Sequence, residues 1–152
     1  MENTQEQLVT DSQVISIEKV LYTGKVHVTG GREGNASSDD GRLQTALTPP
    51  GGKGTGTNPE QLFAAGWSAC FIGAIKHNAA TLGLRVPDTA SVDAEVDLAT
   101  NQDGFLLQAR LRVALPGLEP EAARQLVVAA HDTCPYSKAT RGNINVHIQV
   151  AV

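Results

Sequence analysis

The feature that most constrains this chain is an almost wholly apolar segment from Leu62 to Ile75. The residues before it, Asn58-Pro59-Glu60-Gln61, combine an N-cap, a proline for the first helical position, an acid for the positive helix end and a capping-box-like glutamine. Gly83 can end the helix after about Thr81. We therefore predict a long helix that is apolar on nearly all sides. Such a helix needs cover on all sides, which favours a dimer.

The rest of the sequence predicts strands around this helix and one further helix. Apolar and polar residues alternate from Ile17 to Val28, and again in two short strands on either side of the turn Asp39-Asp40-Gly41. They alternate once more over 92–98 and 105–113, which a hairpin at 101–104 joins, and over the closing strand 144–150. A helix is expected over 118–133. This order predicts an α+β fold with a largely antiparallel sheet.

Composition and charge narrow the class of protein. Residues 1–16 are polar and aperiodic, so we expect a disordered or loosely held tail before a single domain over 17–152. The net charge of −4, from 12 basic and 16 acidic residues, argues against a nucleic-acid or anionic-membrane surface. The start of the chain does not resemble a signal peptide, and no apolar run reaches the ~18 residues of a membrane span. We expect a cytoplasmic protein.

The chain has two cysteines, Cys70 in the apolar segment and Cys134 just before Pro135. In the cytoplasm such cysteines are reduced, metal-bound or catalytic more often than permanently disulfide-bonded. Each could be an inert thiol that packs as a small hydrophobe. Burial raises the pKa of a thiol, so a reactive Cys70 needs a nearby cation. Arg32, beside two glycines, is a candidate for that cation, although spacing alone favours a solvated loop residue.

The residues also allow a nucleotide site and a metal site to be considered. The glycine-rich loop 49–56 precedes the long helix, but it lacks the residues of a Walker A or dinucleotide motif. His131 and Cys134 are three residues apart and could share a helix face, but no second close pair of ligands accompanies them. His77 lies seven residues after Cys70, ~10 Å along a helix, which is too far to share one ion. We expect no metal.

Several stretches of this sequence resemble the organic hydroperoxide resistance (Ohr) proteins of the Ohr/OsmC family. These stretches are Gly30–Gly34, Thr57–Gly66, Ser68–Phe71, Cys134–Ser137 and Ala139–Asn143. The resemblance runs from about Ile17 to the C-terminus and favours the Ohr branch over the sister OsmC branch of peroxidases. It implies an OsmC-like fold, with antiparallel sheets around a long central helix, in an intertwined homodimer.

The resemblance also implies an activity and a set of site residues. The activity is that of a Cys-based peroxidase, an antioxidant oxidoreductase of the oxidative stress response that reduces organic hydroperoxides to alcohols through a redox-active disulfide. Cys70 matches the peroxidatic cysteine and Cys134 the resolving one. Arg32 matches the arginine that stabilises the thiolate and the peroxide, and Glu60 the acid that orients it. The implied reductant is dihydrolipoamide or a lipoylated protein, with no bound cofactor.

Two hypotheses follow from combining the resemblance with spacing. Glu60 and Cys70 are ten residues apart, ~15 Å along one helix, so a single Arg32 could reach both more easily if one chain served the Cys70 of its partner. An apolar substrate pocket around Cys70 would use Phe63, Phe71 and Ile72, although core packing is an alternative for them and for Trp67. The rival function is a redox-sensing protein without turnover.

Overall fold

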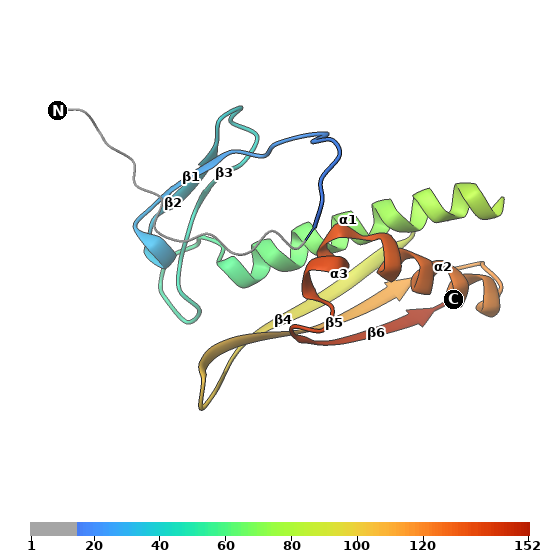
Figure 1. Ribbon diagram of the computed structural model, residues 1–152. Coiled ribbons are helices and arrows are strands. Elements are labelled where there is room, and N and C mark those ends of the chain that lie inside the picture. The colour runs from blue at the N-terminus through green and yellow to red at the C-terminus, as the bar shows by residue number, and fades with distance from the viewer. Residues whose placement is uncertain (1–14) are drawn as a thin grey trace.

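The computed structural model describes residues 15–152, so most of the predicted tail over 1–16 lies outside the described residues (Figure 1). The elements in chain order are β1 (Val26–Thr29), the 3-10 turn η1 (Gly31–Glu33), β2 (Asn35–Ser38), β3 (Gln44–Ala46), α1 (Pro59–Leu82), β4 (Ser91–Asn101), β5 (Gly104–Ala114), α2 (Pro120–Thr133), α3 (Pro135–Thr140) and β6 (Asn145–Ala151). The predicted α+β class is confirmed.

The strands form two separate three-stranded sheets. One has the antiparallel order β1-β2-β3 and lies beside the first turns of α1 (Figure 1). The other has the order β4-β5-β6, with β4 antiparallel to β5 over the predicted hairpin and β5 parallel to β6. The parallel pair follows from the connection, because α2 and α3 carry the chain back across one face of the sheet before β6 begins.

The predicted ends of the long helix are confirmed. The Asn58 side chain accepts a hydrogen bond of 2.9 Å from the main-chain N–H of Gln61, and Pro59 is the first helical residue. Gly83 caps the other end with φ of 68°, a conformation that costs glycine little. The capping box is only half formed, because the Gln61 side chain accepts from the Thr57 hydroxyl at 2.8 Å instead of reaching back to the N-cap.

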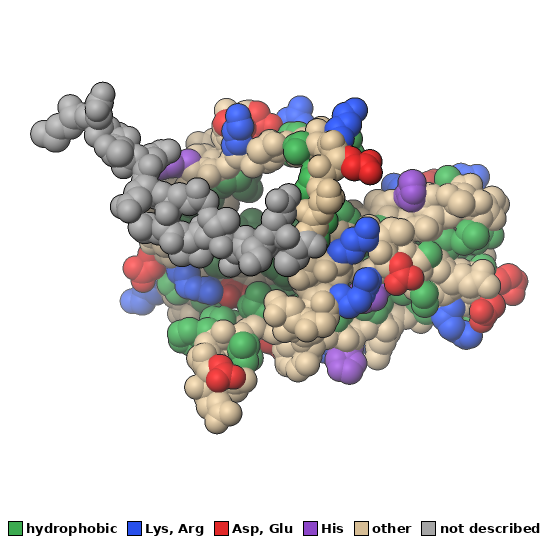
Figure 2. All heavy atoms as spheres, viewed as in Figure 1, with side chains coloured by type: hydrophobic (Ala, Val, Ile, Leu, Met, Phe, Trp, Pro, Cys, Tyr) green, Lys and Arg blue, Asp and Glu red, His purple; other side chains and the backbone are tan. Residues whose placement is uncertain are grey.

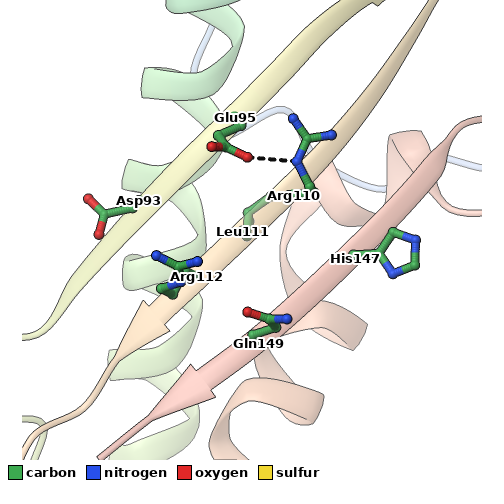
Figure 3. A pocket seen from close by; sticks show the side chains of 7 residues that line it. All are labelled: Asp93, Glu95, Arg110, Leu111, Arg112, His147 and Gln149. Carbon is green, nitrogen blue, oxygen red and sulfur yellow. Dashed lines mark hydrogen bonds and ion pairs between the residues drawn. The ribbon is translucent and has the colours of Figure 1, made fainter.

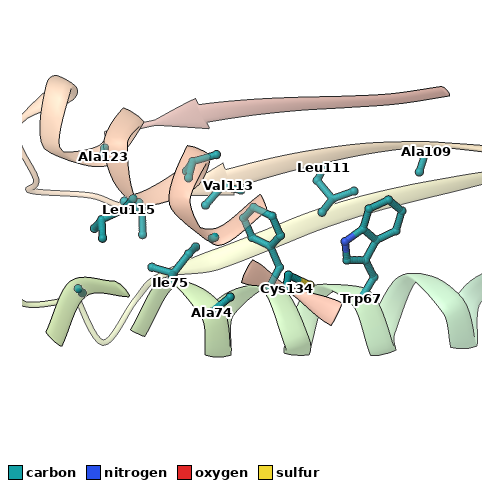
Figure 4. Packing of buried hydrophobic residues seen from close by; sticks show 14 residues of the cluster. Trp67, Ala74, Ile75, Ala109, Leu111, Val113, Leu115, Ala123 and Cys134 are labelled. Atoms are coloured by element: carbon teal, nitrogen blue, oxygen red, sulfur yellow. The ribbon is translucent and has the colours of Figure 1, made fainter. Parts of the chain in front are cut away.

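The hydrophobic core lies between the β4-β5-β6 sheet and the helices α1 and α2 (Figure 4). Its fully buried members include Trp67, Phe71 and Ile75 from α1. From β5, the residue that follows it and α2 come Leu111, Val113, Leu115, Leu126 and Ala130. Cys134 belongs to the same cluster, so one of the two thiols is a core residue.

Only one side of α1 is covered within the chain. The residues Ala65, Ala69 and Gly73, spaced four apart on one face, are exposed. A Cβ added at Gly73 would meet nothing within 4 Å. The sequence predicted that this helix needs cover on all sides, and a single chain leaves a stripe of small residues open.

One sequence prediction about local structure was wrong, and one helix was not predicted. The predicted strand from Ile17 is shorter, because within the described residues no strand forms before Val26, and Val20 and Tyr22 are exposed. Alternation predicts a strand only where a neighbouring strand is available to pair with it. The unpredicted helix is α3, six residues long, in a stretch to which the sequence analysis assigned no element.

Candidate functional site

The two cysteines lie side by side although 64 residues separate them. The Cys134 sulfur is 3.5 Å from the Cys70 sulfur, and both thiols are free. Cys70 sits half-buried in the middle of α1, whereas Cys134 is fully buried and is the single residue between α2 and α3. A disulfide needs its sulfurs ~2.05 Å apart, so a movement of about 1.5 Å would join them.

The surroundings of Cys70 disfavour its thiolate within a single chain. Burial raises its pKa, and the neighbouring Cys134 thiol raises it further. The main-chain N–H of Tyr136 acts in the opposite direction. Among residues 15–152 no cation contributes to this shift. A thiol in such surroundings is a poor nucleophile unless a positive charge is brought to it.

Arg32 and Glu60 form an ion pair with fork geometry. Arg32 Nη1 donates to Glu60 Oε2 at 2.9 Å, and Nη2 donates to Oε1 at 2.7 Å. The hydrogen bonds hold the pKa of the Glu60 carboxyl below its usual value and raise the pKa of the Arg32 guanidinium. Gly30 and Gly31 precede Arg32 with φ of 73° and 58°, left-handed values that glycine adopts without strain. The pair therefore anchors η1 to the first turn of α1.

The thiol pair and the ion pair are separate within one chain. Glu60 lies in the first turn of α1 and Cys70 ten residues later, ~15 Å along the axis. Arg32 Nη1 and Nη2 both donate to the Glu60 carboxylate. The structure thus brings together Cys70 with Cys134, and Arg32 with Glu60, while Arg32 is not among the groups that shift the pKa of Cys70.

The helix α3 contributes contacts to the site that sequence reasoning did not assign. Trp67 Nε1 donates to Ser137 Oγ at 3.2 Å, in the buried space between α1 and α3. The Tyr136 ring meets the edge of Phe63 with centroids 5.9 Å apart. The available signal was Pro135, since proline favours the first position of a helix as well as ending the one before it.

The expected pocket residues differ in accessibility. Phe63 is half-buried and lies edge-on to both Trp67 and Tyr136. Ile72 is also half-buried. Phe71 has no exposed surface and packs in the core, so in this conformation it stands behind the surface around Cys70.

A pocket of about 240 Å³ lies on the opposite face of the β4-β5-β6 sheet (Figure 3). Arg110 lines it and pairs with Glu95 at 2.6 Å and with Asp97 at 2.8 Å. These side chains alternate along the strands with core residues such as Leu111, so they point away from the thiols. The two carboxylates occupy Arg110 and leave it little capacity for a ligand.

Three further features concern metal binding, the distribution of surface charge and membrane-spanning helices. Between residues 15 and 152 there is no cluster of three or more His, Cys, Asp or Glu side chains that could hold a metal. The Nδ1 atom of His131 is buried without a partner, and burial lowers the pKa of its imidazole. On the face in Figure 2, basic and acidic side chains are interspersed. No helix of the described part is long and apolar enough to cross a membrane.

The fold and site define an α+β protein in which a capped central helix and the junction of two shorter helices present a pair of thiols. The chain belongs to the OsmC-like protein family, whose sequence profile matches residues 52–149.

Named relatives place the chain beside the Ohr proteins. It is 49% identical over 140 residues to the organic hydroperoxide resistance protein of Xanthomonas axonopodis pv. citri, covering 90% of this chain and 99% of that protein. The crystal structure of OhrB from Bacillus subtilis matches with a TM-score of 0.82 and 42% identity, covering 87% of this chain and all of the other. A hydroperoxide resistance protein from Legionella pneumophila matches equally well, at 43% identity over 88% of this chain and all of the other. The predicted resemblance and OsmC-like fold are confirmed.

Proposed function

We propose that this protein is a thiol-dependent peroxidase that reduces alkyl or fatty-acid hydroperoxides to alcohols. The observation that carries the proposal is the 3.5 Å approach of the Cys134 and Cys70 sulfurs. A pair of free thiols at this distance can store two electrons and release them as a disulfide. The relatives named organic hydroperoxide resistance proteins support the choice of substrate and a role in hydroperoxide detoxification.

In the first step, the Cys70 thiolate attacks the distal oxygen of the hydroperoxide. The O–O bond breaks, a new S–O bond forms, and the alkoxide leaves and takes up a proton to become the alcohol. Cys70 is then a sulfenic acid, oxidised by two electrons. A cation beside the sulfur assists twice, since it favours the thiolate and stabilises the charge that develops on the leaving oxygen.

In the second step, the Cys134 sulfur attacks the sulfur of the sulfenic acid. The S–S bond forms, the S–O bond breaks, and the hydroxyl group leaves as water with the proton of the Cys134 thiol. A dithiol such as dihydrolipoamide, free or on a lipoylated protein, then reopens the disulfide by exchange. The scheme needs no metal and no resident cofactor.

The cation is provided by Arg32 from a second copy of the chain, in an intertwined homodimer with composite sites. Within one chain Arg32 is paired with Glu60, which precedes Cys70 by ~15 Å along the axis of α1. The exposed face of Ala65, Ala69 and Gly73 carries only small residues, so the main chain of another α1 can approach it closely. Two such helices packed antiparallel would bring the start of one, with its ion pair, beside the middle of the other.

A groove beside the ion pair offers room for the second chain. It has a volume of about 660 Å³ and lies between the start of α1 and β4. Glu60 lines it together with the apolar residues Ala64, Val96 and Leu98. In the dimer, Phe63 and Ile72 form the walls of the substrate pocket, and Phe71 lies behind them. Residues 17–152 form one domain, and the protein acts in the cytoplasm.

Turnover separates the enzyme from a redox sensor with the same thiols. The reduced protein is mixed with cumene hydroperoxide and dihydrolipoamide, and loss of peroxide is followed over many equivalents. Continuous consumption that Cys70→Ser abolishes supports the peroxidase. A single stoichiometric oxidation followed by no further consumption would support the sensor instead.

The composite site is tested by mixing two inactive variants. Cys70→Ser chains keep Arg32, and Arg32→Ala chains keep Cys70. In a mixed dimer one site would combine the intact residue of each chain, so about half of the full activity of one dimer should return in the heterodimer fraction. If Arg32 serves its own chain, neither site is intact and no activity returns.

A further inference from the structure

The short helix α3 is attached to α1 by two contacts that flank the thiol pair. Ser137 lies three residues after Cys134, and Trp67 three residues before Cys70. Their hydrogen bond, from Trp67 Nε1 to Ser137 Oγ at 3.2 Å, therefore lies about one helical turn from the sulfurs on both elements. Both side chains are fully buried, so water cannot replace either partner.

The second contact depends on the absence of a side chain at Gly66. A Cβ at this position would lie 2.8 Å from the Tyr136 hydroxyl oxygen and 3.2 Å from the ring carbon that bears it. Gly66 is four residues before Cys70, so it is on the same face of α1. The glycine admits the Tyr136 ring to the helix surface, where Phe63 meets its edge.

We propose that Ser137 and Gly66 are positioning residues for the thiol pair, because they hold α3 against α1 and so keep the Cys134 sulfur beside the Cys70 sulfur. This inference rests on the proposed function. Cys134 directly precedes α3, so any shift of α3 moves its sulfur. The second chemical step depends on that sulfur, since a misplacement of about 1 Å can slow a reaction by a hundredfold.

A misplaced Cys134 has a distinct chemical consequence. The sulfenic acid on Cys70 would persist, and a second hydroperoxide would oxidise it to the sulfinic acid, which a dithiol does not reduce. The first attack on hydroperoxide does not use Cys134. The positioning residues should therefore affect the partition between disulfide and sulfinic acid much more than the rate of the first oxidation.

The test compares two hydroxyl groups on the same helix. Ser137→Ala removes the acceptor of the Trp67 hydrogen bond, whereas Thr140→Ala removes a hydroxyl that donates only within α3, to the carbonyls of residues 136 and 137. Each reduced variant is treated with excess cumene hydroperoxide, and intact mass separates the disulfide from the sulfinic acid. We expect Ser137→Ala to increase the sulfinic fraction about fivefold or more, with Thr140→Ala close to wild type. Equal values for Ser137→Ala and wild type, or equal increases in both variants, would overturn the proposal.

A second variant tests the same positioning role if Ser137→Ala does not fold. Gly66→Ala introduces a better helix former, so it should not unfold α1, but its methyl group pushes the Tyr136 ring away. It should also increase the sulfinic fraction. Adding Tyr136→Phe removes the atom of closest approach and should restore part of the wild-type partition. An unaffected Gly66→Ala variant would exclude this contact as a positioning element.

A redox titration separates failure of this inference from failure of the peroxidase proposal. The Cys70–Cys134 disulfide is equilibrated with dithiothreitol in the absence of peroxide. Because positioning raises the effective concentration of one thiol at the other, Ser137→Ala should lower the equilibrium constant for disulfide formation about fivefold or more, and Thr140→Ala should not. An unchanged constant in Ser137→Ala would reject the positioning role even in a protein that shows no turnover.

Discussion

Arg32 and Glu60 meet through two parallel hydrogen bonds of 2.9 and 2.7 Å, which join η1 to the first turn of α1. This ion pair fixes the orientation of the Arg32 guanidinium, although Arg32 lies in a turn between two short strands. The carboxylate of Glu60 is largely buried, with 11% of its side chain exposed, so the guanidinium is held on a fixed support. Most of the catalytic predictions depend on this support.

The first prediction concerns the fork of the ion pair. Arg32→Lys keeps the charge but cannot form both hydrogen bonds to Glu60, and Arg32→Ala removes the charge. We expect kcat/KM for cumene hydroperoxide to fall about tenfold in the lysine variant and about a hundredfold or more in the alanine variant. Arg42→Ala is the control, since Arg42 is an exposed arginine near Asp40 at 3.7 Å. Equal activity of the Arg32 variants and this control would contradict the assigned role.

Substitution of each cysteine should stop the reaction at a different step. Cys70→Ser should show no oxidation by hydroperoxide, because the attacking sulfur is gone. Cys134→Ser treated with one equivalent of hydroperoxide should form the sulfenic acid, which a dimedone adduct detects by mass, and excess hydroperoxide should convert it to the sulfinic acid without turnover. Sustained turnover of Cys134→Ser with dihydrolipoamide would show that the second cysteine is dispensable.

The ionisation of Cys70 should depend on Arg32. Burial and the Cys134 thiol raise the pKa of Cys70, and a cation from the partner would lower it. The pH at which iodoacetamide alkylates Cys70 at half its maximal rate should therefore be higher in Arg32→Ala than in wild type. An identical pH profile in the two proteins would place Arg32 away from the sulfur.

The same shift has a consequence for stability, and its sign can be worked out. A thiol whose pKa is raised on folding contributes stability below its unfolded pKa of about 8.5, and this is lost as pH rises through the folded pKa. Above pH 9, Arg32→Ala should lose stability faster than Arg32→Ala/Cys70→Ser. Urea unfolding at matched protein concentrations measures the difference.

The N-cap of α1 should contribute measurably to stability. Asn58→Ala removes the acceptor of the Gln61 main-chain N–H and should lower the free energy of unfolding by about 1 kcal/mol. Asn58→Asp retains an acceptor and places a negative charge at the positive helix end, so it should stay near wild type. The check is urea unfolding at constant protein concentration, with a lower midpoint and unchanged slope in the alanine variant.

Trp67 should report the redox state of the thiols. It is the only tryptophan in the chain, it is fully buried, and its indole N–H binds the helix that follows Cys134. Closing the sulfurs from 3.5 Å to ~2.05 Å moves α3 relative to the indole. We expect reduced and oxidised wild type to differ in fluorescence emission, and Cys134→Ser to show no such difference. Identical emission spectra of the two wild-type forms would show that α3 does not move.

The sequence by itself determined the elements whose signals are local. The start and end of α1 could be predicted because Asn58, Pro59 and Gly83 act on the main chain within one turn of their own positions. The hairpin at 101–104 and the closing strand follow from equally local alternation and turn residues. The four expected catalytic residues came from motifs, and the sequence could not give the distances between them.

Only the tertiary structure decided which of these residues meet. The approach of Cys134 to Cys70 depends on how α2 and α3 pack across α1, a contact over 64 residues that no local pattern encodes. The tertiary structure also has α3 after Cys134 and a parallel pairing of β6 with β5. Residues 17–25 form no strand, because no neighbouring strand pairs with them. The structure also shows that Glu60, the partner of Arg32, and Cys70 lie apart in one chain, since a helix fixes ~15 Å between its residues 60 and 70. That rigid spacing is the physical reason why the site requires a second chain in our proposal.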